Sequence, residues 1–394
     1  MRNNRPTGPT VPLRLALTII ILVLILGVGI FSIIYFVVFK QPGPNIGPTS
    51  TVTPSVNNTQ VVGPGGPCTA NSPYGFTTIH ADSQLVTYYK QLNACWVRYQ
   101  VHWGTHGGKI GIETAPNQYN WAPVDAAIAT MNAAHIHVDF AIQSAPDWDL
   151  TQVCAADGQH FLPGPAEMAK FATVLATRYD GKHGHGYIDS YEIGNEEFDN
   201  HFVPGLGNNQ TCRDASYYGP VLKAGYQAIK AVSPQALVGM FGMWWHYMPH
   251  IQDFMTYLYA NGYGPYMDYM NFHYYHSGGD PSVTMGNDPS FDQEWQTMHN
   301  IAAQHGFANK PIWVTEVGWP TTTFSGASNP VTPQTQSQFM QYILNESMKS
   351  GVVQRVFWFT IDYGQQSDTI YPPNGPLPAF YTLQSMIRQK PRWS

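Results

Sequence analysis

The stretch YEIGNEE, residues 191–197, closes an apolar run that begins at Ile188. A second stretch, WVTEVGW at residues 313–319, has the same form and delivers Glu316 near the end of its apolar run. Each run has the length and composition of a β-strand. Because a barrel of parallel strands keeps its reactive groups at the C-terminal ends of those strands, the two stretches predict a (β/α)8 TIM barrel with two carboxylates at its open end.

The rest of the chain supports this fold. From about residue 70, short apolar runs alternate with longer amphipathic ones, as in βα units. One amphipathic run has apolar side chains at i, i+3, i+4 and i+7 between residues 124 and 131, and another extends from a capping threonine at 332 to a glycine at 351. An open doubly wound sheet is the alternative, although no Gly-x-Gly-x-x-Gly opens a helix. The predicted strands are Tyr74–Ile79, Cys95–Trp103, His137–Gln143, Ile188–Asn195, Ala236–Met240, Tyr269–Tyr274, Pro311–Glu316 and Val353–Ile361.

Composition restricts the partners of this domain. The net charge is -6, the isoelectric point is about 6.2 and no basic block occurs, so the chain lacks the electrostatic signature of a nucleic-acid-binding protein. Aromatic residues make up 14% of the chain and charged residues only 11%. Since Trp and Tyr offer an apolar ring face with a polar group, this excess fits a carbohydrate substrate.

The N-terminal region predicts a membrane anchor. Residues 15–39 carry no charge, and as a helix they would be about 37 Å long, enough to span a bilayer core of about 30 Å. A cleaved signal peptide is the alternative, but its apolar part would be shorter. Arginines before the run place residues 1–14 in the cytoplasm. We therefore expect a single-pass cell-membrane protein with a Pro/Gly/Thr-rich linker at 40–67 and a catalytic domain at 68–394 outside the cytoplasm.

The four cysteines fit an oxidising compartment. None forms a Cys-x-x-Cys pair, which disfavours a zinc or dithiol site. Cys68 precedes the first predicted strand and Cys95 opens the second, so both lie at the bottom of the barrel. Cys154 and Cys212 follow the third and fourth strands and lie at the top. We predict the disulfides Cys68–Cys95 and Cys154–Cys212, with free thiols as the alternative.

The two glutamates predict a specific chemistry. Glycoside hydrolysis needs one acid on the leaving oxygen and a second carboxylate at the other face of the anomeric carbon. Glu196 and Glu316 end the fourth and seventh strands and are 316 - 196 = 120 residues apart. With the strands predicted above, this separation corresponds to three βα units with long loops. Carboxyl groups about 5–5.5 Å apart would indicate retention, and a separation above about 6.5 Å would indicate inversion.

The Asn195-Glu196 pair and the TEVGW stretch at 315–319 resemble the signature of the large clan of (β/α)8 retaining glycoside hydrolases, which includes cellulases, mannanases, β-xylosidases and β-galactosidases. The resemblance covers roughly residues 70–390. It implies that Glu196 is the acid/base, that Glu316 is the nucleophile and that Asn195 holds a sugar 2-hydroxyl. No cofactor is implied. His183, His185 and His201 flank the fourth strand and could suggest a metal, but loop histidines without a carboxylate partner are expected to be solvated, so no metal is predicted.

Further residues resemble clan positions near the nucleophile. Arg98 resembles the arginine that keeps the nucleophile ionised, although it could instead close a buried ion pair. His273 and Tyr275 resemble the clan's His-x-Tyr pair, whose tyrosine hydrogen-bonds the nucleophile. Glu192 and Glu197, beside the acid/base, are expected to be structural or solvated.

Aromatic residues near strand ends are candidates for sugar binding. Trp358 resembles the tryptophan floor of the cleaved subsite, and Trp148 belongs to a Pro-x-Trp similar to that of β-xylosidase-like members. Trp319 is a further candidate, and about half of the tryptophans at strand ends are expected to be packing residues instead. Gln143 stands where a cellulase often has a histidine, so the chain departs from that pattern.

Two other functions are compatible with these residues. A transglycosylase would replace water with a sugar acceptor, and a non-catalytic cell-surface protein would bind carbohydrate on the same fold. The sequence leaves open the sugar, the linkage, internal or terminal cutting, and the oligomeric state.

Overall fold

The computed structural model describes residues 68, 70–79, 81–104, 111–146, 148, 163–196, 215–243, 248–276, 279–322, 330–361 and 368–393. The predicted N-terminus, anchor and linker at 1–14, 15–39 and 40–67 lie outside these residues. Among the helices that are described, none has both the length and the hydropathy to cross a bilayer.

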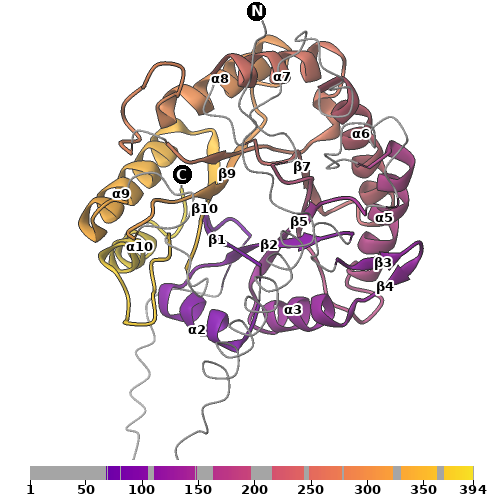
Figure 1. Ribbon diagram of the computed structural model, residues 1–394, viewed down its shortest axis with the longest axis horizontal. Coiled ribbons are helices and arrows are strands. Elements are labelled where there is room, and N and C mark those ends of the chain that lie inside the picture. Colours follow the sequence, from indigo (N-terminus) through magenta and orange to yellow (C-terminus); the bar gives the residue numbers. More distant parts are fainter. Residues whose placement is uncertain are drawn as a thin grey trace, which may run out of the picture. The chain divides into compact units, whose positions relative to one another are not determined.

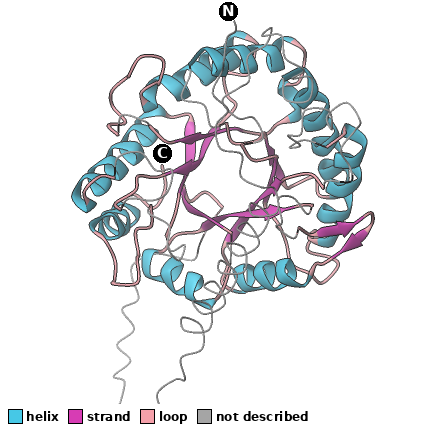
Figure 2. Cartoon of the chain, in the orientation of Figure 1, coloured by secondary structure: helices cyan, strands magenta, loops and turns pink. Residues whose placement is uncertain are grey.

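Eight parallel strands form the centre of the domain, and helices surround them (Figure 1; Figure 2). The strand order is β7-β6-β5-β2-β1-β10-β9-β8. The barrel strands are β1 (Tyr74–Thr78), β2 (Trp96–His102), β5 (His137–Gln143), β6 (Ser190–Ile193), β7 (Leu237–Gly239), β8 (Met270–Tyr274), β9 (Ile312–Val317) and β10 (Val353–Trp358). The helices after them are α2 (Ser83–Leu92), α3 (Ala122–Ala133), α5 (Pro165–Arg178), α6 (Ala215–Val232), α7 (Met248–Ala260), α8 (Phe291–Gln304), α9 (Pro333–Ser350) and α10 (Pro378–Gln389).

The sheet closes between its first and last members. Parallel bridges join Gly239 to Tyr269 and Met243 to Phe272, and the amide of His273 donates to the carbonyl of Met243 at 2.7 Å. These contacts link β7 to β8. The arrangement confirms the barrel and shows that the open doubly wound sheet is wrong.

All eight predicted strands are present, with small differences at their ends. The largest difference is in the fourth, because Gly194 turns the chain out of β6 with φ 105°, a conformation that glycine adopts without steric cost. The hairpin of β3 (Glu113–Ala115) and β4 (Gln118–Tyr119), which follows β2, was not predicted.

The two predicted amphipathic helices are confirmed. In α3 the apolar residues 124, 127, 128 and 131 are buried. In α9 the Thr332 side chain accepts a hydrogen bond from the amide of Thr335, and Gly351 ends the helix with φ 68°.

Aromatic packing fills the bottom of the barrel. The rings of Tyr269 and Trp313 stack with centroids 3.7 Å apart, and the guanidinium of Arg355 lies 4.3 Å from the Trp96 ring and 4.2 Å from the Trp313 ring. The disulfide Cys68–Cys95 joins this cluster with a Cα–Cα distance of 5.2 Å, as predicted. Cys154 and Cys212 lie outside the described residues. The filled bottom leaves the opposite end for a site.

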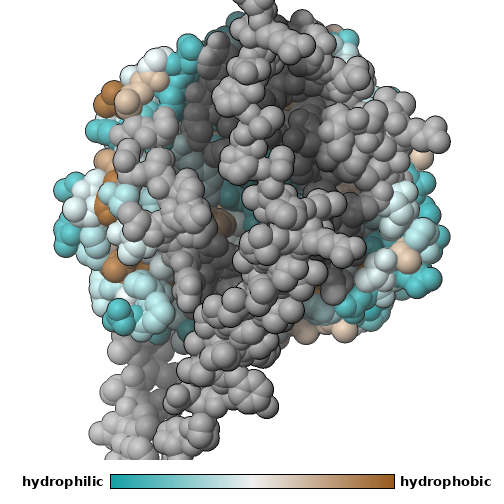
Figure 3. Space-filling model, viewed as in Figure 1, coloured by the Kyte–Doolittle hydropathy of each residue, from teal (hydrophilic) through white to brown (hydrophobic). Residues whose placement is uncertain are grey.

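The described residues on the face shown in Figure 3 are mostly hydrophilic, with scattered hydrophobic ones at the rim.

Candidate active site

Arg98 organises the interior of the barrel. Its side chain points inward from β2 and is fully buried. Nε and Nη2 donate to Oε2 of Glu192 at 2.8 and 2.6 Å, Nη1 donates to Oε1 of Glu316 at 2.7 Å, and Nη2 donates to Oδ1 of Asn195 at 2.6 Å. Burial alone would lower the pKa of Arg98, but the charges of Glu192 and Glu316 raise it, so the guanidinium stays charged. The sequence predicted Arg98 beside Glu316, with a buried ion pair as the alternative. The structure has both, because Arg98 contacts Glu316 and forms a buried ion pair with Glu192.

Three donors surround Glu316, which β9 holds on the inner face of the barrel. Besides Arg98, the amide of Gln100 donates to Oε1 and the hydroxyl of Tyr275 donates to Oε2 at 2.7 Å. Burial, followed by the charge of Glu316, raises the pKa of Tyr275 well above its usual value, so its hydroxyl keeps its proton and remains a donor. An ionised carboxylate is the form that accepts three such bonds.

Glu196 reaches the site from the loop after β6. Its backbone has φ 46°, which is uncommon for a residue other than glycine and is a form of strain that occurs at functional sites. The side chain is 31% exposed, and Oε1 lies 2.6 Å from Nδ1 of His273. Glu196 therefore has more contact with solvent than Glu316, whose side chain is 6% exposed.

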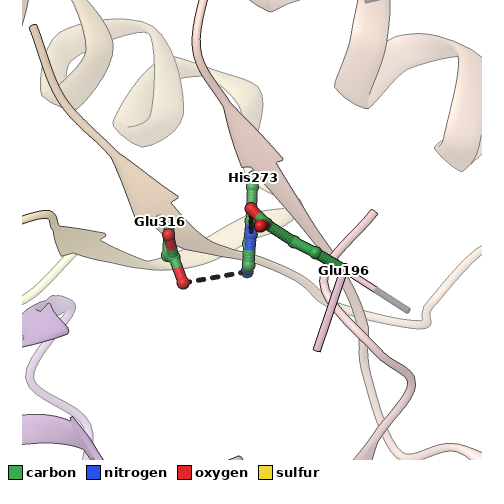
Figure 4. A group of neighbouring side chains, drawn as sticks. All are labelled: Glu196, His273 and Glu316. Carbon is green, nitrogen blue, oxygen red and sulfur yellow. Dashed lines mark hydrogen bonds and ion pairs between the residues drawn. The ribbon is translucent and has the colours of Figure 1, made fainter. Parts of the chain in front are cut away.

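His273 lies between the two glutamates. Figure 4 shows its imidazole on the strand next to that of Glu316, with Glu196 approaching from the other side. Nε2 is 3.7 Å from Oε1 of Glu316. Burial lowers the pKa of His273 to about 3, against the opposing effect of Glu316, so the ring is neutral at ordinary pH. A Cβ at Gly242 would overlap this ring, which explains the glycine there.

One carboxylate oxygen from each glutamate and one nitrogen of His273 all lie within 4.8 Å of one another. Such a group could hold a metal ion. The charge distribution argues against one, because Oε1 of Glu316, which lies 3.7 Å from Nε2 of His273, already receives the Arg98 guanidinium at 2.7 Å. A cation bound there would meet a fixed positive charge. The geometry fits a pair of carboxyl groups that act on a substrate between them.

Asn195 is buried, and its Oδ1 also accepts a bond from the amide of Gln100 at 3.1 Å. Its predicted contact with a sugar 2-hydroxyl stays a prediction. Gln100 was missed by sequence reasoning. It lies two residues beyond Arg98 on β2, and the two-residue period of a strand could have placed both on the inner face.

Two buried acids lie deeper in the barrel. Glu192, which was expected to be structural or solvated, is fully buried against Arg98, and Asp139 on β5 is fully buried beside it. Asp139 was not singled out, although a charged residue inside the apolar run HVDFAIQ was a signal. Glu197 lies outside the described residues.

The three candidate tryptophans have different environments. Trp319 is 3% exposed, and its ring is tilted against that of Trp358 with the centroids 5.9 Å apart. Its Nε1–H donates to the carbonyl of Gly279 at 2.6 Å, so its environment indicates a packing role. Trp358 is also 3% exposed, and its indole nitrogen has no partner among the described residues. Trp148 is 38% exposed. A sugar-binding role for each stays a prediction.

A pocket of about 480 Å³ borders the site at the ends of β1, β2 and β5, within the range of small-molecule sites. Gln100, which contacts Glu316, is part of its wall. His102 and Gln143 are register partners on neighbouring strands and also line it. The described lining contains no Asp, Glu, Lys or Arg: Ile79, Tyr99, Gln100, Val101, His102, Gly111, Ile112, Asn120, Pro123, Val124 and Gln143.

Residues 191–377 match the family model described as glycosyl hydrolase catalytic core. This part of the chain is therefore similar in sequence to a glycosyl hydrolase core. The matched segment begins at the YEIGNEE stretch and contains both Glu196 and Glu316. The match confirms the enzyme class that the two glutamates predicted. No curated protein matches the chain in sequence.

Solved structures of glycosidases share the fold of this chain. A glucosidase from Croceicoccus marinus is 14% identical, with a TM-score of 0.55 over 80% of this chain and 66% of that one. A family 39 glycoside hydrolase from Bacteroides cellulosilyticus is 15% identical, with a TM-score of 0.58 over 80% and 63%. A monomeric β-xylosidase from Caulobacter crescentus is 17% identical, with a TM-score of 0.54 over 82% and 69%. The chain thus spans about two thirds of each of these proteins.

Proposed function

We propose that this protein hydrolyses O-glycosidic bonds by double displacement, with Glu316 as nucleophile and Glu196 as acid/base. The observation that carries the proposal is the pair of carboxylates whose nearest oxygens lie within 4.8 Å at the mouth of the barrel, in unequal surroundings. Glu316 meets a guanidinium, an amide and a phenol, which favour an anion. Glu196 meets a neutral imidazole and solvent.

In the first step, an oxygen of Glu316 attacks the anomeric carbon while Glu196 gives its proton to the leaving oxygen, so a glycosyl ester forms as the glycosidic bond breaks. In the second step, Glu196, now ionised, removes a proton from water, and the resulting nucleophile displaces Glu316. Each group returns to its starting form. Two inversions at one carbon give net retention.

The spacing supports retention over inversion. Inverting enzymes separate their carboxyl groups by about 6.5–9.5 Å to admit a water, whereas retaining ones keep about 5–5.5 Å. Nearest oxygens within 4.8 Å fit the shorter range, and a carboxyl separation of about 5–5.5 Å stays a prediction.

The substrate that the site favours is a neutral carbohydrate, and β-linkage follows from the resemblance to the retaining clan. The pocket beside Gln100 combines amide and imidazole groups with Tyr99 and aliphatic side chains, and its described lining contains no Asp, Glu, Lys or Arg. Amides can bond sugar hydroxyls in either direction, since each has a donor and an acceptor.

The test is a screen of the full chain, in detergent, on β-linked glucan, mannan, xylan and galactan. We expect hydrolysis of at least one, with the product released in its original anomeric form by proton NMR, and no hydrolysis by Glu316→Ala. Azide should restore turnover to both glutamate variants with opposite anomers: an inverted glycosyl azide from Glu316→Ala and a retained one from Glu196→Ala. Retained activity in Glu316→Ala, or an inverted wild-type product, would reject these roles.

The same assays separate the two alternatives. Oligosaccharide products longer than the substrate would identify a transglycosylase. Binding of a glycan without turnover by wild-type protein would identify a non-catalytic binding protein.

We also propose that residues 15–39 anchor the enzyme in the cell membrane. The support is the uncharged run and the arginines before it. Protein that leaves washed membranes in alkaline carbonate would contradict the anchor.

A further inference from the structure

Two buried carboxyl groups lie below the site, on neighbouring strands. Asp139 on β5 is the register partner of both Arg98 on β2 and Ser190 on β6. Glu192 lies two residues beyond Ser190 and so faces the same side of the sheet. Both carboxyl groups are fully buried.

Each carboxyl group has one oxygen that receives a donor and one that does not. Oε2 of Glu192 accepts from Nε and Nη2 of Arg98, while Oε1 has no donor. Oδ1 of Asp139 accepts from the hydroxyl of Tyr269 at 3.0 Å, while Oδ2 has no donor. The register of β5 and β6 places the two acids on the same face of adjacent strands, and each affects the pKa of the other. Two carboxylates cannot bond each other unless one carries a proton.

We propose that Asp139 and Glu192 share a single proton, and that the resulting monoanionic pair positions the Arg98 guanidinium against Glu316. The proton lies on the Asp139 side, because Glu192 is the acid that receives two bonds from Arg98. The functional part of this inference rests on the proposed hydrolase activity.

The charges around the pair agree with one proton. The facing groups are Arg98 on β2, Tyr269 before β8, His273 on β8, Glu316 on β9 and Arg355 on β10. Tyr269 is neutral because burial raises its pKa well above the usual value, and His273 is neutral as described. Burial lowers the pKa of Arg355 only to about 10, so it is charged. Arg355 also interacts with Asp189, so Arg98 faces three carboxyl groups, and one proton on the pair reduces this excess of negative charge.

Burial also favours one proton on the pair, because it raises the pKa of both Asp139 and Glu192 against the opposing effect of Arg98. A second charge on the pair would add an uncompensated anion to a dry interior. Arg98 holds Glu192 with two nitrogens and Glu316 with the third, so the anion on Glu192 fixes the direction of Nη1. Asp139 and Glu192 are therefore positioning residues and do not touch substrate.

The test compares the acidic limb of kcat/KM in wild type, Asp139→Asn and the double variant Asp139→Asn/Glu192→Gln. An asparagine at 139 offers an N–H to Glu192 and leaves the pair with one negative charge, so the limb should stay in place. The double variant removes that charge near Arg98 and Glu316, so the limb should move to lower pH by roughly 1 unit. Gln304→Glu, on the exposed end of α8, controls for a general effect of charge.

Each other outcome overturns the proposal. A limb that moves to lower pH in Asp139→Asn alone would mean that both acids are ionised in wild type. A limb that stays in place in the double variant would mean that both are protonated, or that the pair does not act on Glu316. Thermal unfolding of each variant verifies that it is folded.

Infrared difference spectra test the proton without any need for activity. Wild type minus Asp139→Asn at neutral pH should show the carbonyl stretch of one protonated carboxyl group, and its absence would overturn the proposal. If wild type hydrolyses no glycan, the proposed function fails, and the spectrum alone decides whether the proton is shared.

Discussion

The hydroxyl of Tyr275 donates a hydrogen bond to Oε2 of Glu316 at 2.7 Å. Tyr275 directly follows β8, and Glu316 lies on the adjacent strand β9. The register makes this contact possible, because His273 and Tyr274 pair with Glu316 and Val317. Tyr275 leaves the strand one residue later and reaches the oxygen that Arg98 does not use.

We expect Tyr275→Phe to lower kcat/KM about 10- to 100-fold, because a hydrogen bond to a charged group contributes about 1.5–3 kcal/mol. The acidic limb of the pH profile should also move to higher pH, since the anion loses a donor. Steady-state kinetics from pH 4 to pH 8 measure both effects. Tyr381→Phe on α10, where the ring is 57% exposed, is the matched control. Wild-type kinetics in Tyr275→Phe would contradict the assigned role.

His273 predicts how stability depends on pH. Its folded-state pKa of about 3 lies below the unfolded value of 6.5, so the unfolded chain binds a proton between these pH values and the folded chain does not. This residue's contribution to stability is complete above pH 6.5 and falls as the pH decreases toward 3. At pH 5 the loss would be up to about 2 kcal/mol.

Thermal unfolding at pH 7 and pH 5 tests this dependence. We expect Tm to fall less in His273→Asn than in wild type, while His305→Asn at the exposed end of α8 should behave as wild type. An equal fall in Tm for all three proteins would show that His273 is not buried in its neutral form.

The sequence predicts the parts of this structure that depend on local pattern. Alternating apolar runs identified all eight strands, and the capping threonine and terminal glycine located α9. Motif order placed Glu316 on the seventh barrel strand and Glu196 at the end of the fourth, and the structure has Glu196 in the loop just after that strand. Such features follow from short-range periodicity and capping.

Contacts across the barrel were harder to predict. Gln100 reaches Glu316 over 216 residues of sequence, and only the closed barrel brings them together. The burial of Glu192 and Asp139 depends on the same closure, because a glutamate beside an active-site motif is equally compatible with solvent. Sequence position also could not distinguish a sugar-binding tryptophan from a packing one. Trp319 follows a strand, but Phe339 of helix α9 packs against its ring.

Arg98→Met should be among the most damaging single changes. It removes the cation that Glu192 and Glu316 share, and an unpaired buried charge costs about 3–5 kcal/mol of unfolding free energy. Chemical denaturation measures this loss, with Arg388→Met on the exposed surface of α10 as control. If Arg98→Met lost no more unfolding free energy than the control variant, the two carboxyl groups would have taken up protons and would need no cation.

The Cys68–Cys95 disulfide should stabilise the barrel without affecting the chemistry. It links the segment before β1 to the residue before β2, 27 residues along the chain, and lies in the aromatic cluster at the bottom of the barrel, away from Glu316. A loop of that length predicts a loss of about 3–4 kcal/mol when both cysteines become alanine. Because a reductant would also break the predicted Cys154–Cys212 disulfide, the paired substitution is the cleaner change. We expect a lower Tm with kcat/KM unchanged at a temperature where the variant is folded, whereas a fall in kcat/KM under those conditions would show that the bottom of the barrel influences the geometry at its mouth.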